Sequence, residues 1–176
     1  MLTGCRALFD TRESTRDVLL RRLAGLGIQL VMKVLKIEDK WLEQANAIYF
    51  QLGFVPSCPP ADTTCGVIED VSIVALGRLQ QHADGALEVG GFWVHESRRG
   101  FGLALRVVEH AIALAPMDSG LWCIPFVHLE GFYASFGMKT VAPELAPASI
   151  RDKTAFCRER QRYGIYHATC LMQLVR

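Results

Sequence analysis

The sequence predicts a mixed α/β domain in which helices flank a predominantly antiparallel sheet. Short apolar stretches with strand-like composition alternate with segments of helical periodicity from residue 31 onward. A short polar turn over residues 80–85 joins two of the expected strands. A glycine-rich turn at residues 99–102 joins a further strand to a strongly apolar helix. We find no repeat, no low-complexity stretch and no linker that would separate a second domain.

The expected strands cover residues 31–37, 65–68, 71–79, 87–94, 121–124, 138–141 and 166–175. The expected helices cover residues 41–53, 102–115, 127–136 and 147–162, where apolar residues recur at helical spacing. Residues 55–64 hold three prolines and are expected to form a loop. Residues 1–30 are expected to form a helical extension before a domain of residues 31–176. Alternatively, translation starts at Met32, because residues 32–37 have the pattern of a natural first strand.

The composition is that of a soluble globular protein. Of the 176 residues, 51% are apolar and 21% are charged. The formal net charge of +1 gives no support to a nucleic-acid surface. No apolar run approaches the roughly 20 residues needed to span a bilayer. We therefore expect neither a nucleic acid nor a membrane as a partner.

The six cysteines are scattered along the chain, without the close, repeated spacings of metal sites and disulfide frameworks. Several have apolar neighbours, such as Cys123 and Cys170. A free cysteine in such surroundings behaves as a small buried hydrophobe. We therefore expect no metal site and a reducing, cytoplasmic location.

The strand expected at residues 87–94 changes phase at its glycine pair. Before the pair the apolar residues fall on odd positions, Leu87 and Val89, and after it on even positions, Phe92 and Val94. A shift of one residue at glycine is what a β-bulge produces. A bulge leaves backbone N–H and C=O groups free to bind something else. The alternative is a simple kink in an edge strand.

A glycine-rich turn follows this strand and opens the apolar helix. Residues 94–104 read VHESRRGFGLA. Consecutive N–H groups in such a turn, backed by the positive end of the helix dipole, form a cradle for an anion, and glycine lets a phosphate approach the backbone. The turn has neither the G-x-x-x-x-G-K-[ST] nor the G-x-G-x-x-G motif. By itself it therefore favours a phosphate ligand only modestly.

Two motifs in this region resemble those of the GNAT superfamily of N-acetyltransferases. Residues 99–104 fit the family's [QR]-x-x-G-x-[GA] motif, and residues 131–138 resemble its L-Y-x-x-x-G-F segment. The family's usual approach to the first motif, V-x-P-x-x-R-G-x-G, is matched with Glu96 in place of the proline. The order of elements also follows the family, so the resemblance covers nearly everything except residues 1–30. It implies a bulged fourth strand and a splayed fifth strand.

The resemblance implies acetyl-CoA as the co-substrate and acetyl transfer to a primary amine by direct attack in a ternary complex. The pyrophosphate would lie on the turn, and the pantetheine arm would pair with the bulged strand like an extra strand. The cofactor-binding residues that it implies are Phe92, Trp93, Val94, Arg99, Gly100, Phe101, Gly102, Leu103 and Ala104. An N–H group of the bulge would stabilise the negative charge that develops on the acetyl oxygen.

The predicted catalytic groups are a tyrosine, a glutamate and a histidine. Tyr133 matches the family's general acid, which protonates the departing thiolate, and its alternative role is a packed aromatic. Glu88, just before the bulge, is the first choice for the base, with a solvated strand glutamate as the alternative. Phe126 and Leu129 replace the asparagine and alanine of many family members. His128 nearby is either a second base, a substrate ligand or a structural residue.

Glu69 and Asp70 are further candidates for binding the amine. The acceptor is expected to be a small molecule, with an amino acid preferred, and the oligomeric state is left open, a homodimer included. The alternative function is a domain of the same fold that binds acyl-CoA as a sensor without catalysis. Tyr133 counts against that alternative, whereas Phe126 and Leu129 leave it open. An unrelated phosphate binder is disfavoured, because no metal-binding carboxylate or basic lysine can be placed near the turn.

Overall fold

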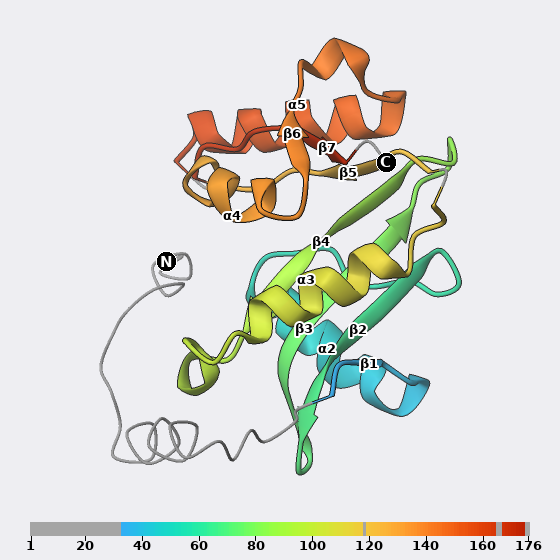
Figure 1. Cartoon of the computed structure of the whole chain (residues 1–176), viewed down its shortest axis with the longest axis vertical. Coiled ribbons are helices and arrows are strands. Elements are labelled where there is room, and N and C mark those ends of the chain that lie inside the picture. Colours follow the sequence, from blue (N-terminus) through green and yellow to red (C-terminus); the bar gives the residue numbers. More distant parts are fainter. Residues whose placement is uncertain (1–32, 118, 165–166, 175–176) are drawn as a thin grey trace.

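The structure is a computed structural model that describes residues 33–117, 119–164 and 167–174. Its strands form one seven-stranded sheet in the order β1-β2-β3-β4-β5-β7-β6. All neighbouring strands are antiparallel except β4 and β5, which run parallel. Helices cover both faces of this sheet (Figure 1). The predicted mixed α/β fold with a mainly antiparallel sheet is confirmed.

The strands are β1 (Leu35–Lys36), β2 (Asp62–Glu69), β3 (Ser72–Gln81), β4 (Leu87–Val94), β5 (Leu121–Cys123), β6 (Met138–Thr140) and β7 (Met172–Leu174). The strands expected at residues 31–37 and 166–175 are shorter within the described residues. Strand β2 is longer than expected, because it starts inside the segment predicted to be a loop. That loop prediction is wrong for Asp62 and Thr64, which pair with β3. Both are buried among polar side chains, which apolar periodicity does not detect.

The α-helices are α2 (Asp39–Gln51), α3 (Leu103–Ala113), α4 (Glu130–Ala134) and α5 (Ala148–Arg162), and the 3₁₀ turns are η1 (Glu96–Arg98), η2 (Val127–Leu129) and η3 (Pro143–Leu145). The helix expected at residues 127–136 is divided into η2 and α4. Gly53 follows α2 with a φ of 73°, and Gly102 precedes α3 with a φ of 75°. Glycine adopts this left-handed conformation without the penalty that a Cβ brings. The two glycines therefore fix where these helices end and begin.

The two faces of the sheet are covered by different helices. Helix α3 packs through Val107 and its apolar neighbours against β2, β3 and β4. Arg78 and Gln80 of β3 are two residues apart and so point to one face. Arg78 lies on the ring of Tyr49 in α2, and Gln80 accepts a hydrogen bond from Lys153 in α5. We therefore distinguish an α3 face, in front of the sheet in Figure 1, from an α2–α5 face behind it.

Strand β4 contains the predicted bulge. Leu76 of β3 pairs with Trp93, and Arg78 pairs with Gly90. One residue of β3 thus lies opposite two residues of β4, which is the definition of a bulge. Gly91 within it has a φ of 62°, a conformation that suits glycine.

Strand β4 is also splayed from its parallel neighbour. β5 pairs only with Leu87 and Glu88, at the start of β4. The remainder of β4, residues 89–94, continues along β3 without β5 beside it. The splay that the family resemblance implied is therefore present.

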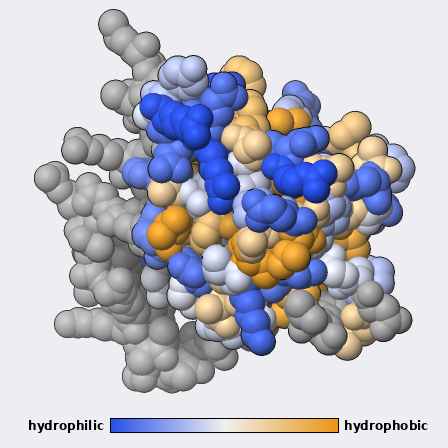
Figure 2. All heavy atoms as spheres, turned by 90° about the horizontal axis from the view of Figure 1, so that it is seen from above, coloured by the Kyte–Doolittle hydropathy of each residue, from blue (hydrophilic) through white to orange (hydrophobic). Residues whose placement is uncertain are grey.

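The face seen from above in Figure 2 mixes hydrophilic and hydrophobic side chains. Within the described ranges, no helix is both long and apolar enough to cross a membrane. The helical extension expected at residues 1–30, and the alternative start at Met32, lie outside the described residues.

Candidate functional site

The splay leaves one edge of β4 open next to the bulge. Backbone N–H and C=O groups of a strand point alternately toward its two neighbours. From residue 89 to residue 94, the groups of β4 that face away from β3 meet no strand in the described part of the chain. An extended ligand chain can pair with such an edge through main-chain hydrogen bonds.

The glycine-rich turn lies where β4 gives way to α3. Gly100 and Gly102 have φ values of 82° and 75°. The first helical hydrogen bond runs from the Arg106 N–H to the Gly102 carbonyl, so the N–H groups of residues 103–105 precede the helical ladder. A Cβ on Gly102 would meet no atom within 4 Å. The turn therefore offers N–H groups at the positive end of α3, with space in front of them for a phosphate.

The two arginines before the turn make different contacts. Arg98 is buried, and its Nε donates to Glu69 Oε2 at 2.8 Å while its Nη2 contacts the same oxygen. This ion pair ties the turn to the end of β2. Arg99 is half-buried, and its Nε donates to the Val94 carbonyl at 3.3 Å. Of the two acidic candidates for the amine, Glu69 is engaged by Arg98, and Asp70 is exposed in the turn that follows β2.

The predicted cofactor-binding residues of β4 face both sides of the sheet. Phe92 packs on the α3 face, with its ring centroid 6.1 Å from that of Tyr133. A Cβ on Gly77 of β3 would lie 2.4 Å from Phe92 Cδ1, so the ring depends on that glycine. Trp93 packs against the core beneath α2. Sequence reasoning missed Gly77, because a glycine within a strand carries no sign of which ring covers it.

The residues after Arg99 differ in what they offer to a ligand. Leu103 is only 2% exposed and belongs to the apolar core, so it offers its backbone N–H rather than its side chain. Phe101 and Ala104 are half-buried, and Gly100 and Gly102 are exposed. The backbone of the turn is therefore its accessible part.

Tyr133 is buried among aromatic residues on the α3 side of the splay. Its ring centroid is 5.2 Å from that of Phe132, and the rings are nearly perpendicular at 81°. Burial raises the pKa of the phenol well above its usual value, and the nearby thiol of Cys123 raises this pKa further. The hydroxyl therefore stays protonated at neutral pH, which is the state that a proton donor needs.

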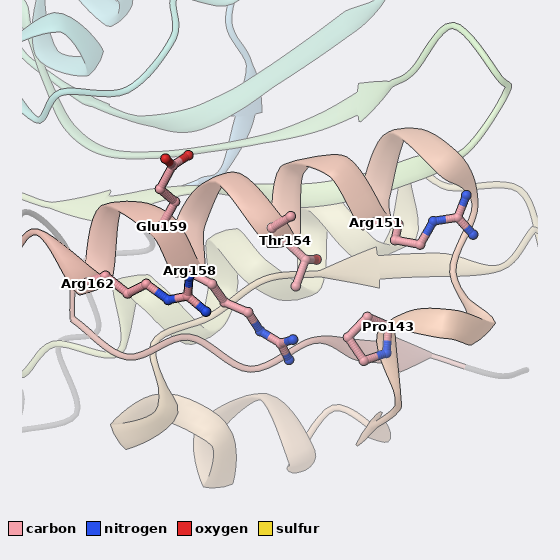
Figure 3. Close-up of a pocket in the computed structure, with 7 residues that line it drawn as sticks. Pro143, Arg151, Thr154, Arg158, Glu159 and Arg162 are labelled. Carbon is pink, nitrogen blue, oxygen red and sulfur yellow. The ribbon is translucent and has the colours of Figure 1, made fainter.

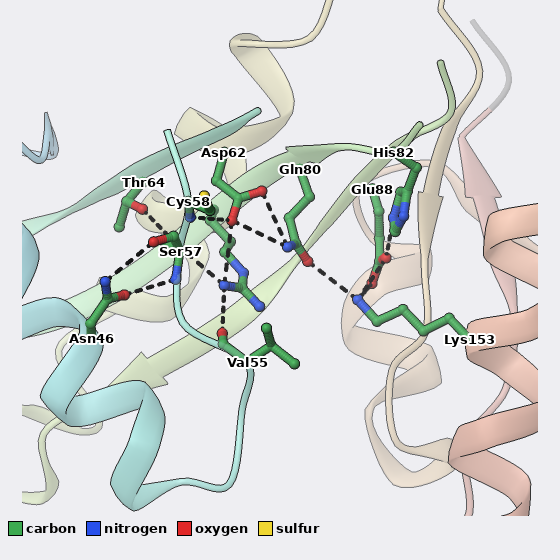
Figure 4. A network of polar contacts seen from close by, with 11 residues as sticks. Asn46, Val55, Ser57, Cys58, Asp62, Thr64, Gln80, His82, Glu88 and Lys153 are labelled. Carbon is green, nitrogen blue, oxygen red and sulfur yellow. Dashed lines mark hydrogen bonds and ion pairs between the residues drawn. The ribbon is translucent and has the colours of Figure 1, made fainter. Parts of the chain in front are cut away.

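Glu88 is buried on the α2–α5 face, in the polar network drawn in Figure 4. Lys153 Nζ donates to both carboxylate oxygens at 2.8 Å, and His82 Nε2 lies 2.9 Å from Oε2. Burial by itself raises the pKa of this carboxyl, but the hydrogen bond with His82 and the charge of Lys153 outweigh it and hold the pKa below its usual value. The group is thus an ionised carboxylate at neutral pH.

The two predicted proton-transfer groups lie on opposite faces of β4. Tyr133 packs with Phe92 on the α3 face, whereas Glu88 contacts α5 on the other face. Both are close to the open edge: Glu88 is the last residue that pairs with β5, and Phe92 is part of the bulge. A thioester held along that edge would therefore have one group on each side.

His128 is exposed at the start of the segment that leads into α4. Its ring stacks on Phe126 with centroids 5.8 Å apart and contacts the edge of His167 at 5.9 Å. The segment is held by an N–H bond from Val127 to the Ala168 carbonyl at 2.7 Å. Sequence reasoning missed His167, because nothing along the chain links it to His128.

A separate hollow of about 430 Å³ lies along α5 and η3 (Figure 3). It is lined by Pro143, Arg151, Thr154, Ala155, Arg158, Glu159 and Arg162. None of the predicted site residues borders it. Among the residues that the structure describes, no group of three or more His, Cys, Asp or Glu side chains is placed to hold a metal ion.

A comparison with protein families agrees with this geometry. A model of the acetyltransferase (GNAT) family matches residues 34–138, which include the bulged strand, the glycine-rich turn and α4. The chain belongs to the GNAT acetyltransferase family. A comparison with curated proteins finds no match.

Solved structures share the GNAT fold at low sequence identity. An acetyltransferase of the GNAT family from Staphylococcus aureus Mu50 has a TM-score of 0.56 and 9% identity, over 80% of this chain and 96% of that chain. Rv2747 from Mycobacterium tuberculosis, in complex with CoA and NLQ, has a TM-score of 0.59 and 14% identity, over 82% and 99%. N-acetylglutamate synthase from Neisseria gonorrhoeae, complexed with CoA and L-arginine, has a TM-score of 0.55 and 13% identity, over 82% and 33%. At these identities the likeness shows the fold alone.

The residues of this GNAT domain fit a CoA thioester. The space in front of Gly102 accommodates a phosphate group, and the N–H groups at the start of α3 are directed at it. The open edge of β4 accommodates an extended arm between the turn and the bulge. The donor set is thus mainly backbone, which explains why few side chains in the turn are charged.

Proposed function

We propose that the protein is an acetyl-CoA-dependent N-acetyltransferase that acetylates the primary amine of a small molecule, by direct attack in a ternary complex. The observation that carries this proposal is the open edge of β4, which leads from the bulge to the glycine-rich turn. An extended pantetheine arm requires such an edge, and a pyrophosphate requires such a turn. Membership of the GNAT family supports acetyl transfer, and two of the solved neighbours hold CoA.

The chain's own residues would hold and orient the co-substrate as follows. Residues 99–104 would bind the pyrophosphate, mainly through backbone N–H groups. The backbone of Phe92, Trp93 and Val94 would pair with the pantetheine arm. An N–H group of the bulge would donate to the acetyl oxygen, where negative charge develops. Bound acetyl-CoA supplies the activated acetyl group as a thioester.

The proton balance assigns a role to each predicted group. The acceptor ammonium loses two protons and gains the acetyl group, whereas CoA leaves as a thiol that takes up one proton. Tyr133 would donate that proton to the sulfur, because it is protonated on the α3 side of the edge. Glu88 would accept a proton from the amine on the other side and pass it to His82, 2.9 Å away and 19% exposed. His128 is the alternative base.

A single hydroxyl tests this function most sharply. Tyr133→Phe keeps the packing of the ring and removes only the proposed proton donor. We expect the turnover rate to fall about 10²–10⁴-fold, the range for a lost acid or base. We expect the dissociation constant for acetyl-CoA, measured by calorimetry, to change little. Turnover is followed as the release of free CoA thiol over a panel of amines.

Tyr163→Phe is the matched control, because Tyr163 is 74% exposed at the end of α5. It should retain full turnover. Undiminished turnover in Tyr133→Phe would remove the tyrosine from the mechanism. Tight binding of acetyl-CoA without turnover of any amine would favour the sensor, in which the same turn and edge serve binding alone.

The same proposal places the reaction in a reducing, cytoplasmic setting. The five cysteines that the structure describes are free: Cys58, Cys65, Cys123, Cys157 and Cys170. Cys65 and Cys123 are fully enclosed by the apolar core, as expected of cysteines that serve as small hydrophobes.

A further inference from the structure

Two buried polar atoms without a hydrogen-bond partner lie beside the β4 bulge. Tyr49 Oη and Arg78 Nε are shielded from solvent and have no partner in the part of the chain that the structure describes. A Cβ on Gly91 would lie 3.2 Å from Tyr49 Oη and 3.3 Å from Arg78 Nε. The two atoms thus converge on one glycine, from α2 and from β3. Buried polar groups in proteins are nearly always hydrogen-bonded, so this pair calls for a ligand group.

The other contacts of Arg78 fix the direction of its free donor. Nη1 donates to the Val55 carbonyl at 2.8 Å and to Ser57 Oγ at 3.3 Å, and it lies 3.7 Å from Asp62 Oδ2. Figure 4 shows these partners at the end of α2 and the start of β2. The guanidinium also lies over the Tyr49 ring, with Cζ 4.7 Å from its centroid. Arginine only donates, so the group that fits its Nε–H must accept hydrogen bonds.

The Glu88 carboxylate lies on the same stretch of β4, one residue earlier along the glycine pair. A Cβ on Gly90 would lie 3.4 Å from Glu88 Oε1. The charge of Glu88 is paired with Lys153, and that of Arg78 is paired with Asp62. The polar network is therefore balanced by itself. A guest that carries one positive and one negative group preserves this balance, whereas a guest of net charge disturbs it.

We propose that the acceptor is an α-amino acid whose nitrogen lies beside Gly90, next to Glu88, and whose carboxylate is bound by Tyr49 and Arg78 beside Gly91. This inference rests on the proposed acetyl transfer and names its substrate class. Consecutive Cα atoms are about 3.8 Å apart, which suits the short separation of the amine and carboxylate of an α-amino acid. Both glycines are half-buried, so a guest reaches the strand where side chains are missing.

A purely structural role is the competing explanation. In that case Tyr49 and Arg78 only pack beneath Gly91 and hold the bulge, and they have no influence on which acceptor is used. The two explanations differ for Tyr49→Phe. A ligand-binding hydroxyl contributes to the KM of carboxylate acceptors, whereas a packing residue contributes to stability alone.

The test uses matched sets of three acceptors: an α-amino acid, its carboxamide, and the amine that lacks the carboxyl group. Glycine, phenylalanine and glutamate each provide such a set. With saturating acetyl-CoA, we expect the kcat/KM of the free acid to exceed that of both analogues at least tenfold for the preferred side chain. In Tyr49→Phe we expect the KM for the acid to rise about tenfold, as for the loss of one hydrogen bond to a charged group. The kcat, and the KM for the carboxamide, should change little.

Arg78→Lys provides a second variant, which keeps the positive charge and removes the Nε–H. It should raise the KM for the acid as well, with an unchanged dissociation constant for acetyl-CoA. Tyr163→Phe serves as the control without effect. The melting temperature of Tyr49→Phe should not fall, because the hydroxyl that it removes has no partner in the free protein.

Equal kcat/KM for the acid and its carboxamide in the wild type would overturn the proposal. So would a rise in KM that is the same for acid and carboxamide in Tyr49→Phe, or a lower melting temperature with unchanged KM. Failure of the acetyl transfer itself looks different, because no amine would then release CoA thiol. In that event, calorimetry with the amino acid and CoA decides: binding that is lost in Tyr49→Phe supports the subsite, and absence of binding overturns it.

Discussion

Gly77 shows how a missing side chain shapes the site at the scale of single residues. A Cβ at this position would lie 2.4 Å from the Phe92 ring and 2.9 Å from Val107 Cγ1. Its absence lets Phe92 lie against β3, where it packs on Tyr133. The position of the proposed proton donor thus depends on a glycine in the neighbouring strand.

We expect Gly77→Ala to destabilise the protein by about 1–3 kcal/mol, because the added methyl group overpacks a filled core. The measurement is equilibrium unfolding in urea. Gly131→Ala is the control: a Cβ there meets no atom within 4 Å, and Gly131 lies in helix α4. The control should be as stable as the wild type or more stable by up to about 1 kcal/mol. Equal stability of the two variants would contradict the packing argument.

Glu88 links stability to pH. Its pKa in the folded protein lies below the ordinary value of 4.5, so its contribution to stability is fully present above pH 4.5. The contribution is lost as the pH falls below 4.5 and through the lower folded pKa. We expect Glu88→Gln to reduce the free energy of unfolding by about 2 kcal/mol at pH 7, through the loss of its bonds with Lys153 and His82.

Urea unfolding of the wild type and Glu88→Gln at several pH values between 7 and 3 measures this difference. It should shrink as the pH falls, because protonated Glu88 no longer differs in charge from glutamine. The exposed Glu43 of α2 provides the control, Glu43→Gln, with little effect at any pH. A difference that stays constant down to pH 3 would argue against the ionised pair.

At the scale of elements, the sequence predicted those parts of the fold that have a local pattern. Helix α3 has a clear apolar face, and β4 shows its bulge as a phase shift at two glycines. The start of β2 has no such pattern, because Asp62 and Thr64 are buried by polar partners that lie elsewhere in the chain. Periodicity reports burial against apolar surroundings only, and it therefore ended this strand too late.

The candidate site divides in the same way. Its backbone part, the turn at residues 99–104, is continuous in the sequence and could be found from it. Its proposed acceptor part could not, since Tyr49, Arg78 and Lys153 belong to α2, β3 and α5 and meet only after the sheet has formed. No spacing in the chain distinguishes these residues from ordinary core and surface positions.

The turn itself provides the prediction at this scale. We expect Gly102→Val to weaken acetyl-CoA binding at least tenfold, because its side chain would occupy the space in front of the turn. The measurement is the dissociation constant from calorimetry. The substitution also strains the backbone at a φ of 75°, so a loss of stability of about 1–2 kcal/mol accompanies it.

Gly53→Val separates the two effects. Gly53 has a φ of 73°, and a Cβ there also meets nothing within 4 Å, but it lies at the end of α2. We expect the same loss of stability and an unchanged dissociation constant. A similar weakening of binding in both variants would attribute the effect to general destabilisation.

The whole molecule consists of two halves that meet at the β4–β5 pair. The first half holds β1 to β4 with α2 and α3, and the second holds β5 to β7 with α4 and α5. Only two residue pairs of the ladder join them, Leu87 with Leu121 and Glu88 with Trp122. The proposed co-substrate would therefore contact both halves, the turn of the first and Tyr133 of the second.

A chain that begins at Met32 contains every strand and helix described above. We expect such a chain to fold and to bind acetyl-CoA with an unchanged dissociation constant. Circular dichroism and calorimetry on the shortened and full chains measure this. An insoluble shortened chain, or one with a markedly lower melting temperature, would show that residues 1–31 contribute to the stability of the domain.

The place of β7 between β5 and β6 has a consequence for how the protein forms during its synthesis. Strands β2, β3 and β4 pair with their neighbours in sequence, so this half can close as soon as they leave the ribosome. Strands β5 and β6 emerge before β7 and have no contact with each other until it is made. Their unpaired edges are exposed to other chains during that interval, so the nascent second half is the stage at which aggregation competes with folding.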